Sequence, residues 1–120
     1  MGLKMLRKKD QAVILDQGVL ADRFLLRLVG LMGKTSLPAG AGILFPANNS
    51  IHMWMMRMPI DAIFLKKLPE GWQILALYPK LKPWKLLPVA CWKADDTLEL
   101  PSGTIERLKL KEGEVLCIAS

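Results

Sequence analysis

Apolar residues recur in short runs separated by turn signals along most of the chain. The stretch 42–65 shows this most clearly: Gly-Ile-Leu-Phe, an Asn-Asn turn, Ile-His-Met-Trp-Met-Met, then a proline and Asp-Ala-Ile-Phe-Leu. Apolar runs of this length with Gly, Pro and Asn between them are typical of β-strands. The pattern predicts strands at 12–15, 43–45, 51–56, 61–66, 72–78, 89–93, 97–100 and 115–119.

Two segments have helical spacing instead. Asp22 is a plausible N-cap for an apolar face that runs from Phe24 to Met32, and Ser102 precedes a shorter helix at 103–108. Asp16-Gln17-Gly18 is a turn signal that should end the first strand. Many short strands with frequent turns indicate a mainly β fold, a β-sandwich or small barrel with two short helices.

The chain of 120 residues fits one domain. We divide it into a basic, loose N-terminal segment at 1–10 and a single β-sandwich domain at 11–120. Hydrophobic residues make up 52% of the sequence, which supplies a packed core and argues against a disordered chain.

The formal net charge is +6, but the basic residues are spread along the chain, so solubility is their expected role. Lys80, Lys82 and Lys85 flank Pro83-Trp84 and make a weak case for contact with nucleic acid or an anionic membrane. No secretory signal or membrane-spanning run is visible, so the sequence predicts a cytoplasmic protein.

The two cysteines, Cys91 and Cys117, lie in apolar, strand-like contexts and are expected to be buried free thiols. A disulfide requires that their strands be neighbours. Two cysteines and one histidine give no zinc-type spacing, and we predict neither a metal nor a cofactor.

Four blocks of sequence carry a family resemblance: Ala21-Asp22-Arg23 with Gly30 to Lys34, Ile51-His52-Met53-Trp54-Met55 with Pro59 to Leu65, Pro83-Trp84, and Leu98 to Gly103. In order and spacing the chain resembles the domain of unknown function 192 family, also called UPF0127, from about residue 21 to 119. The resemblance implies a compact, jelly-roll-like β-sandwich and an uncharacterised function. Gly113-Glu114 departs slightly from the Gly-Asp usual in the family.

The second block places polar groups inside an apolar run, where each must find a partner or lose free energy. On an extended strand His52 and Trp54 point to the same side, so His52 is either a satisfied core histidine or a ligand donor and general base. Arg57 follows closely and is a candidate partner for an acid.

Asp61 either accepts backbone N–H groups or pairs with Arg57 or Arg23, or it works with His52 at a pocket. Glu99 lies between two leucines on a strand and points away from them, either to solvent or inward towards Arg23. Trp84 either tucks onto the fold or stacks on a ligand.

Three functions remain open. The first is a binding module for a small polar ligand such as a sugar, with ligand-binding candidates His52, Trp54, Arg57, Asp61, Trp84, Arg23 and Glu99. The second is a small hydrolase or isomerase that uses His52 and Asp61, although no catalytic nucleophile is visible. The third is a basic module for anionic surfaces or nucleic acid. The sequence predicts no oligomeric state.

Overall fold

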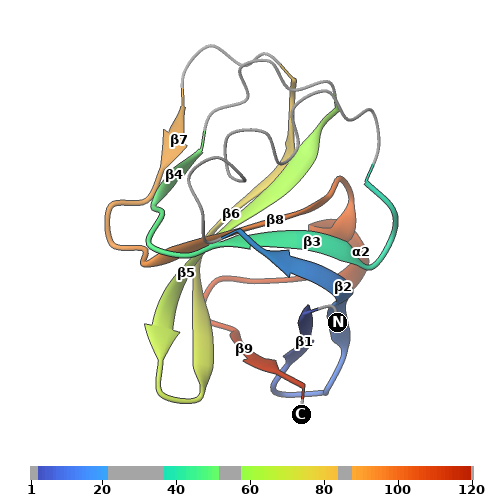
Figure 1. Ribbon diagram of the computed structural model, residues 1–120, viewed down its shortest axis with the longest axis vertical. Helices are drawn as coiled ribbons and strands as arrows, with labels where there is room; N and C mark the ends of the chain where they lie inside the picture. The colour runs from blue at the N-terminus through green and yellow to red at the C-terminus, as the bar shows by residue number, and fades with distance from the viewer. Residues whose placement is uncertain (1–2, 22–36, 52–57, 84–87, 120) are drawn as a thin grey trace.

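The structure is a computed structural model that describes residues 3–21, 37–51, 58–83 and 88–119. The described residues form nine strands and one helix (Figure 1). The strands are β1 (Leu3–Arg7), β2 (Val13–Leu20), β3 (Ala41–Phe45), β4 (Ser50–Ile51), β5 (Ile60–Leu68), β6 (Gly71–Leu81), β7 (Val89–Ala90), β8 (Asp96–Pro101) and β9 (Val115–Ile118), and the helix is α2 (Thr104–Leu108).

Seven strands close into a barrel in the order β1-β2-β3-β8-β5-β6-β9, and β1 completes the circle by pairing with both β2 and β9. The pair β2–β3 is parallel, and the other pairs are antiparallel. The short strands β4 and β7 form a separate two-stranded sheet. The prediction of a mainly β small barrel is confirmed, whereas the finer jelly-roll assignment stays a prediction.

Of the two predicted helices, only the one at 103–108 is found among the described residues, as α2. The segment from Phe24 to Met32 lies outside the described residues, so nothing in the structure supports a second helix. No helix in the described part of the chain has the length and apolar character needed to cross a bilayer.

The hairpin of β5 and β6 is the longest strand pair, and the strands predicted at 61–66 and 72–78 lie within it. Leu68 pairs with Gly71 across Pro69-Glu70, because proline and glycine suit a tight turn. Gly71 is required there for a second reason: a Cβ at this position would overlap the carbonyl oxygen of Leu116 on β9. The hairpin therefore fixes β6 against β9 and helps to close the barrel.

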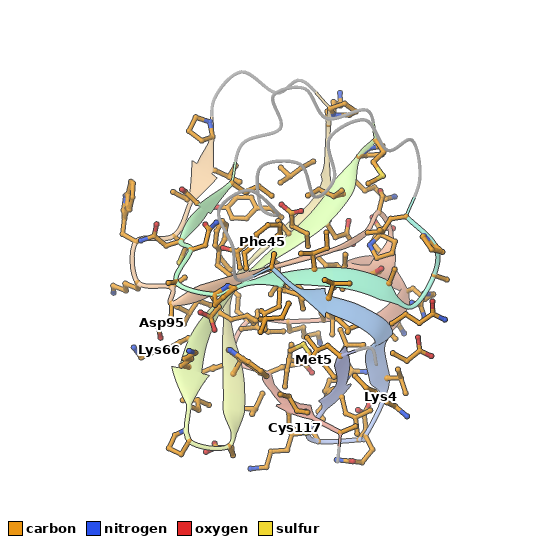
Figure 2. All side chains as sticks on the ribbon, in the orientation of Figure 1. Lys4, Met5, Phe45, Lys66, Asp95 and Cys117 are labelled. Atoms are coloured by element: carbon orange, nitrogen blue, oxygen red, sulfur yellow. The ribbon has the colours of Figure 1, made fainter. Side chains whose placement is uncertain are left out.

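Two apolar clusters lie on the two sides of the wall formed by β3, β8, β5 and β6. The first fills the barrel, because it draws residues from all seven barrel strands, for example Met5 from β1 and Leu116 from β9. The second covers the outer face of the wall and includes Phe45, Ala62 and Ile51 of β4. Figure 2 shows Phe45 and Met5 on opposite sides of the sheet. These four strands are thus covered by apolar side chains on both faces.

Two predictions about the N-terminal part of the chain are wrong. Residues 3–7 are not a loose segment outside the domain, because they form β1, in which Met5 is fully buried and Arg7 is 8% exposed. The first strand does not end at Gly18, because β2 runs on to Leu20 and pairs there with β3. Gly18 instead permits close approach to β1, since a Cβ would contact the backbone oxygen of Leu3 at 3.0 Å.

Both cysteines are free thiols, as expected, but Cys91 and Cys117 are half-buried rather than buried. Cys91 follows the small β4–β7 sheet, and Cys117 lies on β9 of the barrel.

Candidate functional site

Glu99 is the candidate whose surroundings differ most from those of an ordinary surface carboxylate. It lies in the middle of β8, where Ile43 of β3 and Ala62 of β5 are its cross-strand neighbours. Residues opposite one another in a ladder share a face, so Glu99 points into the outer apolar cluster. Its exposed fraction is only 7%, so of the two alternatives for Glu99 the one that points it to solvent is wrong.

Burial changes the acid chemistry of this side chain. No hydrogen bond or ion pair joins the Glu99 carboxyl to another described residue. Removal of the carboxylate from water penalises its charged form, and burial raises the pKa of Glu99 to about 8. At neutral pH the group is therefore mostly a neutral carboxylic acid, which can both donate and accept a hydrogen bond.

The outer cluster is also where two stretches outside the described residues are attached. Ile51 precedes the stretch 52–57 and Met58 follows it, and both belong to the outer cluster. Ala21, which precedes 22–36, belongs to the same cluster, and Leu37, which follows that stretch, packs against it. The residues on either side of both stretches thus lie at the face that carries Glu99. These two stretches contain several of the other site candidates.

Asp61 has a different environment and a structural role. It is fully buried at the start of β5, and its two oxygens accept three backbone N–H groups. The donors are Lys80 N at 2.8 Å, Gly103 N at 3.2 Å and Ile105 N at 2.7 Å. The prediction that Asp61 accepts backbone N–H groups is confirmed. These bonds tie the end of β6 and the start of α2 to β5 and give partners to three backbone N–H groups, of which that of Ile105 is buried.

The structure does not bring Asp61 and Glu99 together. Asp61 pairs with Leu100, whereas Glu99 pairs with Ala62, the next residue along β5. Because neighbouring residues on a strand point to opposite faces, the two carboxyls lie on opposite sides of the wall. The two side chains therefore do not line a single hollow.

The remaining site candidates lie outside the described residues. They are His52, Trp54, Arg57, Trp84 and Arg23. Of the three lysines weighed for an anionic partner, Lys82 is exposed, Lys85 lies outside the described part, and Lys80 is paired with Glu106 at 3.1 Å. That ion pair reduces the positive charge that the Lys80 side chain presents to a ligand.

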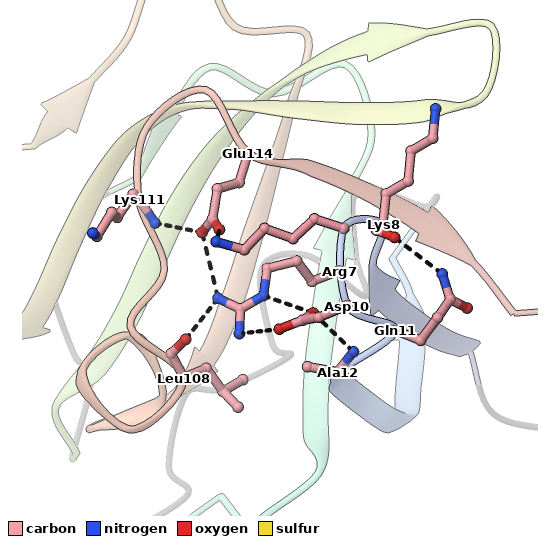
Figure 3. Close-up of polar contacts among 9 residues, drawn as sticks. Arg7, Lys8, Asp10, Gln11, Ala12, Leu108, Lys111 and Glu114 are labelled. Carbon is pink, nitrogen blue, oxygen red and sulfur yellow. Dashed lines mark hydrogen bonds and ion pairs between the residues drawn. The ribbon is translucent and has the colours of Figure 1, made fainter.

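A polar network that the sequence did not reveal joins the two ends of the chain. Arg7 forms a two-pronged contact with Asp10 at 3.1 and 3.0 Å, and its remaining NH1 group donates to the Leu108 carbonyl at 2.7 Å (Figure 3). The same guanidinium lies 3.5 Å from Glu114. Its hydrogen bonds to Asp10 raise the pKa of Arg7 against the opposing effect of burial. The only signal for this network in the local sequence is that Met5 and Arg7 are two positions apart, which places both side chains on one face of a strand.

The described residues offer hydrogen-bonding chemistry at Glu99 but no metal-ligating constellation. No group of three or more His, Cys, Asp or Glu side chains placed to hold an ion occurs within the described part of the chain. What the described residues support chemically is recognition of a donor or acceptor group by one buried acid on an apolar wall.

Residues 6–118 match the model of the DUF192 family, described as "Uncharacterized ACR". No curated protein matches the chain. A Sinorhizobium meliloti protein described as a "putative transcription regulator" is similar in structure, at 23% identity and a TM-score of 0.74, covering 97% of this chain and 91% of its own. A Novosphingobium aromaticivorans protein of unknown function is 21% identical with a TM-score of 0.77, covering 95% and 81%. At these identities the likeness shows the fold alone.

Proposed function

The chain belongs to the uncharacterised DUF192 family, and we propose that it is a binding module for a small, uncharged polar ligand held on the outer face of the barrel wall. The observation that carries this proposal is the Glu99 carboxyl, buried among apolar side chains with no partner among the described residues. A buried polar group without a partner costs about 1–3 kcal/mol. A ligand that donates a hydrogen bond to Glu99, or accepts one from it, would recover free energy of this size on binding.

The protonation state of Glu99 supports a neutral ligand. Because burial raises the pKa of Glu99 to about 8, the acid is neutral at pH 7 and offers one O–H donor and a carbonyl acceptor. A sugar or polyol hydroxyl is complementary to that pair, because it too both donates and accepts. An anionic ligand would instead oppose any ionisation of Glu99, and its own charge would be desolvated against an apolar wall.

The candidates on the attached stretches fit the same proposal. His52 directly follows Ile51, and Arg57 directly precedes Met58, and both of these anchors belong to the outer cluster. We propose that His52 and Arg57 supply further hydrogen bonds and that Trp54 and Trp84 stack on the apolar face of a sugar ring.

The alternative of a hydrolase or isomerase has less support. It requires Asp61 to orient His52, yet both oxygens of Asp61 already accept backbone N–H groups. An ionised carboxylate offers about four acceptor positions, and three are used here, so at most one is left to orient His52. We therefore assign Asp61 to the framework and not to the ligand.

The test is a thermal-unfolding screen against a panel of monosaccharides and sugar alcohols at pH 6.5. A ligand at one hundred times its dissociation constant should stabilise the fold by about 2.7 kcal/mol. Glu99→Leu should abolish the shift, whereas Glu99→Gln, which keeps a donor and an acceptor, should retain most of it. Glu106→Gln is the matched control, because Glu106 is exposed. A flat response across the panel, or a shift that survives Glu99→Leu, His52→Ala and Trp84→Ala, would refute the proposal.

A further inference from the structure

A hollow of about 690 Å³ lies where the turn after β1 meets the turn before β9. Three lysines, Lys8, Lys9 and Lys111, line it together with the segment 112–115. Gly113 forms part of its edge, and a Cβ built there meets nothing within 4 Å. The hollow is thus an open surface groove bordered by three lysines, and none of the residues that line it belongs to β8, the strand of Glu99.

The ion-pair network of Arg7 reaches this groove through Glu114 and Lys9. Glu114 has a side chain that is 10% exposed and lies 2.9 Å from the Lys9 ammonium group, while Lys111 N donates to it at 2.7 Å. Burial raises the pKa of Glu114, but the hydrogen bonds from Lys9 and Lys111 N, together with the charge of Arg7, outweigh burial and hold the pKa below its ordinary value. Glu114 therefore stays charged and, together with Asp10, offsets the charges of Arg7 and Lys9.

The remaining charge of the groove is positive. Lys8 and Lys111 are exposed, and no acid in the described part of the chain forms an ion pair with either ammonium group. The only other acid of the lining is Glu112. Arg107 and Lys109 flank Leu108, whose carbonyl is bonded by Arg7, and add two exposed cations beside the network.

We propose that this groove binds the phosphate backbone of a nucleic acid strand, with Lys8 and Lys111 as its contacts. Figure 3 shows the two side chains on opposite sides of the ion-pair network, so their ammonium groups do not converge on one point. One small anion would engage only one of them at a time. A strand with successive phosphates can engage both, and each contact releases bound counterions.

A lipid surface suits the groove less well. Binding at a bilayer interface needs apolar side chains that enter the headgroup region beside the cations. The large exposed apolar side chains in the described part of the chain are Val13, Val19, Leu20, Trp92 and Ile118. None of them lines the groove.

The test is a salt titration of binding to a fluorescently labelled, single-stranded oligonucleotide, followed by anisotropy. The double variant Lys8→Gln/Lys111→Gln should weaken binding about tenfold at low salt and reduce the slope of log K against log salt by roughly 1.4, about 0.7 for each lost phosphate contact. Denaturant unfolding should show that the variant remains folded.

The matched control is Lys66→Gln/Lys93→Gln, which removes the same charge from two exposed lysines, one on β5 and one between β7 and β8. It should leave the salt slope unchanged and the affinity within about twofold, because it removes no phosphate contact. An equal loss in both double variants would overturn the proposal, since diffuse charge would then explain the binding. Binding to phosphatidylserine vesicles with none to the oligonucleotide at low salt would overturn it as well.

Discussion

The Glu99 carboxyl should make the stability of the barrel depend on pH in an unusual direction. Most acids in folded proteins have a lowered pKa and stabilise the fold as the pH rises. Burial instead raises the pKa of Glu99 from 4.5 to about 8. Between these two values the folded chain therefore keeps a proton on Glu99 that the unfolded chain has already released. Raising the pH through this interval is the perturbation that tests the difference.

The sign and the size follow from proton linkage. The stabilising effect of the raised pKa is fully present below pH 4.5, is lost as the pH rises through the interval to about 8, and is constant above it. Each pH unit in that interval lowers the free energy of unfolding by about 1.4 kcal/mol. Over roughly three and a half units the total is about 5 kcal/mol, a large share of the 5–15 kcal/mol typical of a folded domain.

The assay is urea unfolding of the unchanged chain and of Glu99→Gln at half-unit steps from pH 5 to pH 9. The amide is neutral throughout, so the difference between the two chains isolates Glu99 from every other titrating group. We expect the unchanged chain to lose about 1.4 kcal/mol per unit relative to the variant up to pH 8. Two parallel curves would refute the reasoning.

Three substitutions test the framework around the site. Asp61→Asn replaces one acceptor by a donor among three backbone N–H groups, so unfolding free energy should fall by about 3 kcal/mol and amide exchange in α2 should accelerate. Trp72→Phe removes the indole N–H that donates to Asp96 at 2.8 Å, which should cost about 2 kcal/mol in denaturant unfolding; no change would show that water replaces it. Gly71→Ala should cost more than about 3 kcal/mol because its Cβ overlaps β9, whereas Gly113→Ala, in open space at φ 89°, should cost about 1; equal losses would contradict this contrast.

The strands were predictable where a regular pattern met a clear turn signal. The β5–β6 hairpin is such a case, since apolar runs flank Pro69-Glu70-Gly71. The turn predicted at Gly18 is wrong because a glycine is equally compatible with a turn and with a close backbone approach, and here it packs against β1. Strand β1 was missed because Lys4 within it and Lys8 and Lys9 directly after it make the segment read as basic, while Met5 and Arg7 are buried.

The site was only partly predictable, because burial depends on what covers a strand. Alternation correctly placed Glu99 on the face of β8 opposite to Leu98 and Leu100. It could not show that this second face is also covered, since that depends on how β4 and β7 and the wall strands pack. The partners of Arg7 come from position 10 and from positions 108 and 114, and the last two become its neighbours only when the barrel closes.

The most direct test of the account is the pKa of Glu99 itself, measured from the side-chain carboxyl carbon shift by ¹³C NMR between pH 3 and pH 10. We expect a midpoint near 8 in the free chain, because the carboxyl is buried on an apolar wall with no partner among the described residues. A midpoint near 4.5, the value of a solvated glutamate, would contradict the account, since Glu99 would then be a charged group that needs no ligand.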